Sequence, residues 1–243
     1  MHSLVFQTSV GEFHLQAHVV KEDIRGYTKH PPQVLPTPQR AVTVRQYCPP
    51  GGHKEIGATI AERQKWTLYI LHSPFSSSMW AVWKPDGSWW MTVDYRELNK
   101  VVPPRHAAVP SIHDLIDQLT TVLGTNHYVV GLANAFFSIA IAAENQDQFA
   151  FTWEGHQWMF QVLPKGYLYS PTICHGLVAG DLEKWPHPTS VKLFHYIDDV
   201  LLTSDSFADL EQCAPKLIEH LESCGWAVNA TKIQGPILSV KFW

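Results

Sequence analysis

The sequence is poor in cysteine and has no long apolar run, and both absences narrow what the protein can be. Its 4 cysteines form no Cys-x-x-Cys pair, so we expect free thiols rather than a disulfide framework or a zinc site. The apolar stretch of residues 128–143 is interrupted by Asn134 and Ser138 and falls short of the roughly 20 residues that a membrane span needs. Residues 1–11 lack the basic start and apolar run of a secretory signal. We therefore expect a cytoplasmic protein without a membrane span.

Charged residues are also few, at 16% of the chain, and the two signs nearly balance, so that the net charge is −4. This average conceals a difference along the sequence. Residues 40–110 carry nine Lys/Arg against five Asp/Glu, whereas residues 111–243 carry six against fourteen. A basic segment can bind phosphates and an acidic one can bind a divalent cation, although ordinary solvated charge explains the imbalance about as well.

The spacing of apolar residues, turns and caps predicts antiparallel hairpins packed with helices. Four prolines between residues 31 and 38 precede any regular pattern, so residues 1–40 are expected to be a linker with little fixed structure. Beyond them, the pattern predicts hairpins over 80–95, 148–162 and 192–203, a strand over 128–130, and helices over 55–61, 112–123, 170–185 and 207–221. The expected fold class is α+β.

Two adjacent aspartates, Asp198 and Asp199, lie at the expected tip of the last hairpin, between the apolar runs 193–194 and 200–202. Two carboxylates this close raise each other's pKa unless a cation stabilises both, and hard Mg²⁺ prefers carboxylate oxygens. Taken alone, an Asp-Asp pair is more often a polar turn with two exposed acids. A cation site and a plain turn are both consistent with these residues.

The blocks around this pair resemble retroviral reverse transcriptases, in the same order along the chain. Residues 196–199, Tyr-Ile-Asp-Asp, match the Tyr-x-Asp-Asp signature of that family. Further blocks that look like retroviral Pol are 83–89 (Trp-Lys-Pro-Asp-Gly-Ser-Trp), 93–100 (Val-Asp-Tyr-Arg-Glu-Leu-Asn-Lys), 135–139 (Ala-Phe-Phe-Ser-Ile), 148–151 (Gln-Phe-Ala-Phe), and Leu163-Pro164 with Gly166-Tyr167 and Ser170-Pro171. The resemblance covers about residues 46–242 and is closest in character to an endogenous retrovirus Pol polyprotein.

This resemblance implies a domain arrangement for the whole chain. Residues 41–243 would form the fingers and palm of a right-hand polymerase, with antiparallel hairpins and packed helices. Residues 1–40 would be the linker or pre-polymerase segment. Because the match ends near the C-terminal Trp243, the thumb, connection and RNase H parts are expected to be absent from this chain.

In that family three palm aspartates hold two Mg²⁺ ions, with Mn²⁺ as a possible substitute. The resemblance implies that Asp198 and Asp199 are catalytic residues and metal ligands. The third aspartate would stand where this chain has Gly131, and glycine brings no ligand oxygen on a side chain. Asn134 is neutral and three residues away, so it does not replace the lost charge. The resemblance therefore implies a weakened Mg²⁺ site.

The resemblance also implies a nucleotide-binding set of Lys84, Phe136 and Lys165. Lys84 would face the triphosphate, and Phe136 would exclude a ribose 2′-hydroxyl, with a plain core phenylalanine as the alternative. Lys165 stands where the family has a glutamine that contacts the nucleotide sugar, and it would offer a charged donor there. Trp90 replaces an arginine of the family, so a guanidinium fork is lost.

Three functions are compatible with these residues. The first is an RNA-directed DNA polymerase, a nucleotidyltransferase that uses an RNA or DNA template-primer and dNTP, made inactive by Gly131. The second is a non-catalytic nucleic-acid-binding relic of an endogenous retrovirus, a pseudoenzyme, which accounts for Gly131, Trp90 and the shortened end together. A hydrolase that uses Asp198 and Asp199 for metal-assisted cleavage is the third, but it gains no support from Lys84.

Overall fold

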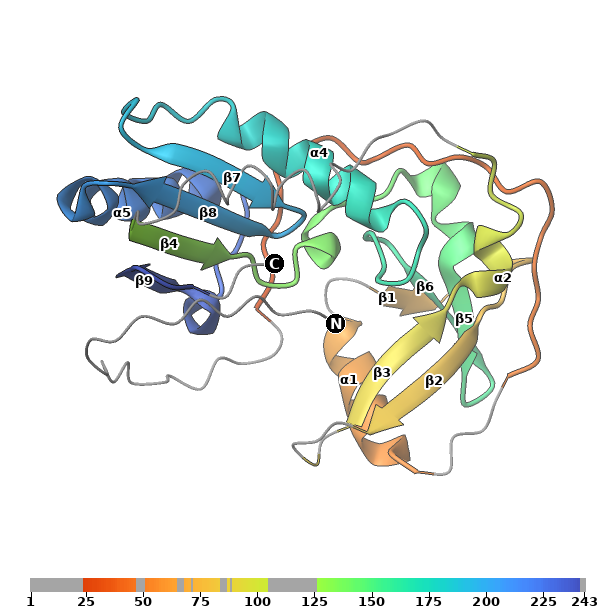
Figure 1. Cartoon of the computed structure of the whole chain (residues 1–243). Coiled ribbons are helices and arrows are strands. Elements are labelled where there is room, and N and C mark those ends of the chain that lie inside the picture. Colours follow the sequence, from red (N-terminus) through yellow and green to blue (C-terminus); the bar gives the residue numbers. More distant parts are fainter. Residues whose placement is uncertain are drawn as a thin grey trace. The chain divides into compact units, whose positions relative to one another are not determined.

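The computed structural model of the chain divides into two compact units (Figure 1). The described residues are 24–46, 51–64, 68–70, 72–83, 87, 89–104 and 126–240. The first unit consists of residues 1–29, 108–138 and 171–243, and the second unit consists of residues 30–107 and 139–170. Each unit is therefore assembled from segments that are far apart in the sequence. The helix expected over 112–123 lies outside the described residues.

The first unit is built on a four-stranded antiparallel sheet in the order β7-β8-β4-β9 (Figure 1). Its strands are β4 (Asn126–Gly131), β7 (Lys192–Tyr196), β8 (Asp199–Ser204) and β9 (Gln234–Ile237). All of β8 is buried, because its apolar run has a strand on each side and a helix on one face. The hairpin predicted over 192–203 is confirmed as β7 and β8.

The helix α5 (Phe207–Ser223) packs one apolar face against β4 and β8. The buried residues of this face are Leu210, Cys213, Ala214, Leu217 and Leu221. The helix begins after Ser206, whose hydroxyl accepts a hydrogen bond from the backbone N–H of Asp209 at 3.2 Å. Gly225 follows its end with a left-handed φ of 94°. The predicted helix is confirmed, together with its C-terminal glycine.

A buried carboxylate links the helix α4 (Ser170–Leu182) to the end of α5. Asp181 is only 3% exposed, and it accepts a hydrogen bond from Trp226 Nε1 at 2.8 Å and from Lys184 Nζ at 3.4 Å. His220 Nε2 donates to the backbone carbonyl of Asp181 at 2.8 Å. Because a buried charge is costly unless it is paired and hydrogen-bonded, these contacts hold the ends of the two helices together.

The second unit contains a three-stranded antiparallel sheet in the order β1-β6-β5 and a separate hairpin of β2 and β3 (Figure 1). Its elements are β1 (Leu68–Ile70), β2 (Ser78–Trp83), β3 (Trp89–Asp94), β5 (Ala150–Trp153), β6 (His156–Phe160), α1 (His53–Arg63) and α2 (Arg96–Asn99). In its core, the ring of Phe149 makes edge-to-face contacts with Tyr95 and Tyr167, with centroids 5.6 and 4.9 Å apart. Both predicted hairpins and the helix predicted over 55–61 are confirmed.

The described residues also contain four single-turn 3₁₀ helices. These are η1 (Phe136–Ser138), η2 (Ala143–Asn145), η3 (Asp147–Phe149) and η4 (Ala230–Lys232). The short helix η4 precedes β9 and contributes a side chain to the site described below. None of the helices that the structure describes is long and apolar enough to span a membrane.

The described residues before α1 form isolated bridges but no helix or strand, yet their backbone has defined partners. In the first unit, Gly26 N donates to Ser138 Oγ at 2.9 Å and Lys29 N donates to Cys224 O at 3.0 Å. A Cβ on Gly26 would overlap the carbonyl oxygen of Gly225, so this crossing requires a glycine. Residues 26–29 of the expected linker therefore follow an irregular path with specific contacts.

Two histidines stack between α4 and β7. The rings of His175 and His195 have centroids 4.0 Å apart and are inclined by 11°. Burial and, to a lesser extent, the charge of His175 lower the pKa of His195, a hydrogen bond to the His175 carbonyl opposes them, and the net result is a pKa of about 4. Ile197 N donates to His175 Nδ1 at 3.3 Å, which requires that nitrogen to be unprotonated. Both rings are therefore neutral in the folded protein near pH 7.

We predict that His195 makes the protein less stable in acid. The unfolded chain protonates this ring near pH 6.5 and the folded protein only near 4, so the unfolded state binds more protons between these values. The stability that the folded protein has with a neutral His195 is fully present above pH 6.5, and it is lost as the pH falls toward 4. In urea denaturation, wild type should lose up to about 3 kcal/mol relative to His195→Phe between pH 7 and pH 4. Parallel pH curves for the two proteins would contradict this prediction.

Candidate active site

The aspartate pair lies where the sheet of the first unit turns from β7 into β8. Asp199 opens β8 and pairs with Tyr196, and the turn between them holds Ile197 at a left-handed φ of 56°. A β-branched residue in this region is strained by on the order of 1–3 kcal/mol and persists only where its surroundings hold it. Leu132 N holds the turn by donating to the Asp198 carbonyl at 2.8 Å. The tip of this hairpin is therefore a fixed structure.

The two carboxylates differ in burial. The side chain of Asp199 is 10% exposed and that of Asp198 is 35% exposed. Burial and, to a lesser extent, the charge of Asp198 raise the pKa of Asp199, Lys232 opposes them, and the net result is a pKa of about 6. The plain exposed turn that the Asp-Asp pair alone would suggest is therefore not what the structure shows. A partly buried pair of this kind requires a cation as a partner.

Gly131, the last residue of β4, lies directly opposite Asp199 in the sheet. A Cβ built on it would overlap Cδ of Lys232 and would lie 2.7 Å from Cβ of Lys232 and 2.8 Å from Oδ1 of Asp199. Distances below 3.0 Å are not found for real Cβ atoms. Any side chain at position 131 therefore requires Lys232 to move.

The cation at the aspartate pair is the ammonium of Lys232. Its Nζ lies 3.2 Å from Oδ2 of Asp198 and 3.4 Å from Oδ1 of Asp199, and its side chain is 42% exposed. Burial opposes the charged form of Lys232, but the charges of the two aspartates outweigh it, so the pKa of the ammonium is raised. The ammonium therefore bridges the two carboxylates.

The backbone around Lys232 is tied to the end of β4. Asn229 N donates to the carbonyl of Gly131 at 2.8 Å, and Lys232 N donates to the carbonyl of Asn229 at 2.9 Å. The side chain of Asn229 caps η4, accepting from Thr231 N at 3.0 Å and from Thr231 Oγ1 at 2.7 Å. Lys232 was not identified from the sequence, because no motif or spacing connects it to residues 198–199.

These residues do not fit a site for two divalent cations held by three carboxylates. Among the described residues no group of three or more His, Cys, Asp or Glu side chains is placed to hold a metal ion. The site offers the carboxylates of Asp198 and Asp199 together with one ammonium, and position 131 has no side-chain oxygen. Hard cations bind through several oxygen ligands, so the donor set is short of what such a site needs.

The other residues that the sequence predicts for the site do not all belong to the unit that contains Asp198 and Asp199. Phe136 begins η1 in the first unit with a partly exposed ring, while Phe137 beside it is buried. Lys165 is partly exposed and belongs to the second unit. Lys84 lies outside the described residues, and Trp90 is placed only as a residue of β3 that pairs with Val82. Their roles toward a nucleotide thus stay predictions.

Comparison with known proteins identifies the family to which this fold and its Asp-Asp hairpin belong. A family model described as reverse transcriptase (RNA-dependent DNA polymerase) matches residues 82–242. The chain therefore belongs to the reverse transcriptase family, and the predicted retroviral resemblance is confirmed at that level.

Among similar proteins is the Gag-Pol polyprotein of walleye dermal sarcoma virus, 33% identical over 198 residues, or 79% of this chain and 11% of that protein. The Pro-Pol polyprotein of feline foamy virus is 32% identical over 209 residues, or 86% of this chain and 16% of that protein. The chain thus spans about a tenth to a sixth of these relatives.

A similar solved structure is the foamy viral protease-reverse transcriptase in complex with RNA/DNA hybrid, with a TM-score of 0.78 and 27% identity. The match covers 89% of this chain and 28% of that chain. The foamy viral enzyme has also been solved with double-stranded DNA, at a TM-score of 0.76. This similarity confirms the α+β fold class predicted from the sequence.

The close approach at position 131 generates a stability prediction. Gly131→Ala should destabilise the protein by about 1–3 kcal/mol, because its Cβ is forced against Lys232 and Asp199 in a packed site. Gly176→Ala in α4 is the matched control, since a Cβ there meets nothing within 4 Å and alanine favours a helix by about 1 kcal/mol. Urea denaturation of both variants measures the effect, and equal changes in stability would contradict the prediction.

Proposed function

We propose that the chain is the fingers and palm portion of a reverse transcriptase that binds template-primer but transfers nucleotides poorly or not at all. In this proposal the first unit is the palm, with Asp198 and Asp199 as the remaining metal ligands, and the second unit is the fingers. Lys84, Phe136 and Lys165 would face the nucleotide. A lineage from an endogenous retrovirus Pol polyprotein accounts for a palm that has lost a ligand, because such a copy is free to accumulate these changes.

The observation that carries this proposal is the pairing of Gly131 with Asp199 beside the ammonium of Lys232. Two-metal nucleotidyl transfer requires carboxylates that hold both ions in place while charge develops on the attacking and leaving oxygens. Here the site combines two carboxylates with one ammonium. A single negative charge then remains, which is insufficient for two divalent cations.

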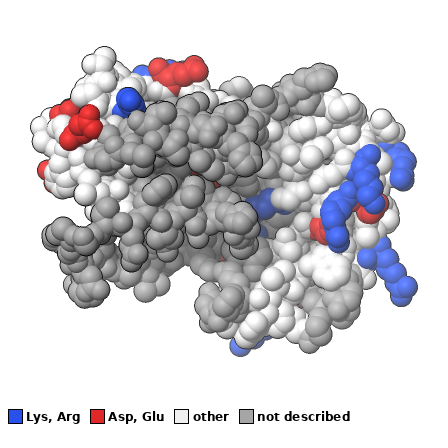
Figure 2. All heavy atoms as spheres, viewed as in Figure 1, with Lys and Arg blue, Asp and Glu red and all other residues white. Residues whose placement is uncertain are grey.

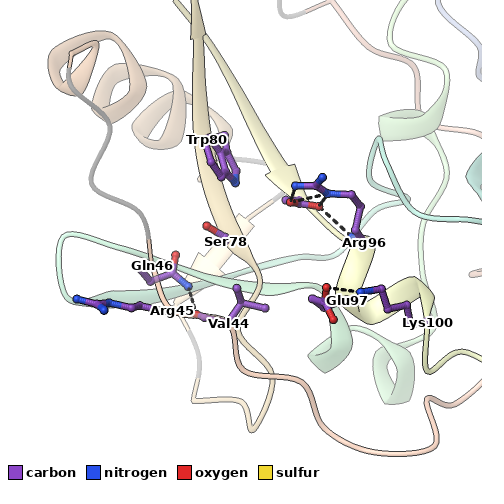
Figure 3. A pocket seen from close by; sticks show the side chains of 9 residues that line it. Val44, Arg45, Gln46, Ser78, Trp80, Arg96, Glu97 and Lys100 are labelled. Carbon is purple, nitrogen blue, oxygen red and sulfur yellow. Dashed lines mark hydrogen bonds and ion pairs between the residues drawn. The ribbon is translucent and has the colours of Figure 1, made fainter.

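A cavity in the second unit supports binding of a nucleic-acid strand. It has a volume of about 810 Å³ and is lined by residues of β2, β3, α2 and the segment before α1 (Figure 3). The lining residues are Val44, Arg45, Gln46, Ser78, Trp80, Asp94, Arg96, Glu97 and Lys100. Cationic side chains can hold phosphates and an aromatic ring can stack on a base, which is the combination that binds single strands.

Two of the three cationic side chains that line this cavity, Arg96 and Lys100, are held in defined positions by ion pairs. Figure 2 shows Lys and Arg side chains gathered over α2 with acidic residues beside them. Arg96 Nε donates to both carboxylate oxygens of Asp94 at 2.9 Å, and Lys100 Nζ donates to Glu97 at 2.6 Å (Figure 3). Trp80 points from β2 toward the same space and is 37% exposed. The relatives solved with RNA/DNA hybrid and double-stranded DNA support nucleic acid as the ligand.

Primer extension tests the catalytic part of the proposal. Purified protein with a primed RNA template, dNTP and Mg²⁺ should extend the primer no faster than the same protein carrying Asp198→Ala and Asp199→Ala. Groups that merely support metal ligands already contribute about 10–100-fold, and a missing ligand should matter more. An active retroviral enzyme on the same template serves as the positive control. Clearly faster extension by the wild type would show that the palm is catalytic as it stands.

Salt-dependent binding tests the nucleic-acid part. Affinity for a fluorescent single-stranded template should fall steeply between about 50 and 200 mM salt, as phosphate-dominated binding does. Arg45→Gln should weaken binding and reduce the slope of log K against log salt by about 1. Arg40→Gln is the matched control, because Arg40 is likewise exposed but does not line the cavity. Equal effects of the two substitutions would rule out the cavity as the binding site.

A further inference from the structure

We propose that Lys232 is a built-in counter-ion of the aspartate pair, which takes the place of a divalent cation and opposes its binding. The inference rests on the proposed function for the role of Asp198 and Asp199 as metal ligands. It adds that the palm is blocked by a specific side chain and is not merely short of one ligand.

The first support is that the ammonium bridges the pair. Nζ lies 3.2 Å from Asp198 and 3.4 Å from Asp199, so it is shared between the carboxylates in the way a cation ligated by both would be. A divalent ion that took one oxygen from each carboxylate would have to displace this ammonium or lie directly beside it. Like charges at such a distance repel strongly in a partly buried site.

The second support is that Gly131 and Lys232 are matched to one another in space. The stem of Lys232 fills the position that any side chain at 131 would need, because a Cβ there would lie 2.7 Å from Cβ of the lysine. A carboxylate at 131 and this conformation of Lys232 therefore exclude each other. The absence of a side chain at 131 is therefore what allows Lys232 to adopt this conformation.

The third support is that the backbone aims the lysine at the pair. The hydrogen bond from Asn229 N to the Gly131 carbonyl joins η4 to β4, and the side chain of Asn229 caps η4 at Thr231. Lys232 N donates to Asn229 O within the same turn. Because these bonds position the start of the side chain, less conformational entropy is lost when the ammonium reaches the carboxylates than for a lysine on an unconstrained loop.

Binding of Mn²⁺ alone, in the absence of nucleic acid and dNTP, tests this inference. Electron paramagnetic resonance of free Mn²⁺ gives the affinity of each folded variant. Lys232→Gln should bind Mn²⁺ about 10-fold or more tightly than wild type, because it removes the competing charge and retains both carboxylates. Lys232→Arg keeps the charge and should bind as weakly as wild type. Lys192→Gln, which removes an exposed lysine of β7, should also leave the affinity unchanged.

Two further measurements make the result decisive. Adding Asp198→Asn to Lys232→Gln should abolish the gain, which places the ion at the aspartate pair. In wild type, reductive methylation followed by mass spectrometry should show Lys232 reacting more slowly than exposed Lys216, and millimolar Mn²⁺ should raise its reactivity. This second measurement needs no variant, so it applies even if Lys232→Gln does not fold.

The inference is overturned if folded Lys232→Gln binds Mn²⁺ no more tightly than wild type, or if Lys232 of the wild type reacts as fast as Lys216 with and without Mn²⁺. These outcomes are distinguishable from failure of the proposed function. Primer extension by wild type would refute the proposed loss of catalysis, whereas unchanged Mn²⁺ affinity in Lys232→Gln would refute only the role of the lysine.

Discussion

The arrangement of the first unit depends on a carboxylate that opens a buried central strand. Asp199 is the first residue of β8, and every residue of that strand is buried. A charge in this position must be compensated, because the strand cannot move toward solvent without breaking its pairing with β4 and β7. The turn at Ile197, the glycine that ends β4 and the lysine of η4 all surround this one carboxylate. The local structure can therefore be understood as the way the fold accommodates a buried negative charge.

Local patterns in the sequence were sufficient for most of this architecture. The hairpin of β7 and β8 follows from apolar runs on either side of two aspartates, and α5 follows from its apolar spacing and Gly225, because hairpins and helices are determined by neighbouring residues. The contact of Lys232 with Asp199 could not be predicted in this way. It joins residues from η4 and β8 that are brought together only by the pairing of β4 with its neighbours. The spacing of residues along the sequence does not indicate a contact of this kind.

The resemblance to the family indicates a missing oxygen ligand at position 131 but does not show what fills the space there. A missing aspartate is read as a missing oxygen ligand, and the search for a substitute then turns to Asn134. In the structure, Asn134 donates its side-chain amide to the carbonyl of Ile24 at 3.0 Å, and the space left at Gly131 is filled by the methylene stem of Lys232. The excess of Lys and Arg over residues 40–110 likewise does not show which charges can bind a ligand. Arg96, for example, is paired with Asp94 in the structure.

The close crossing of Gly26 and Gly225 bears on how the molecule can be divided. The composition of the sequence suggests a boundary near residue 41, after the cluster of four prolines over residues 31–38. A fragment that begins there would lack the backbone that passes over Gly225 and would leave Ser138 and the end of α5 without their hydrogen-bond partners. The first unit, which is formed mainly by the second half of the chain, therefore includes a short segment that precedes the second unit in the sequence. Recombination or truncation that removes residues 26–29 would disturb a unit whose other parts lie far along the chain, in residues 108–138 and 171–243.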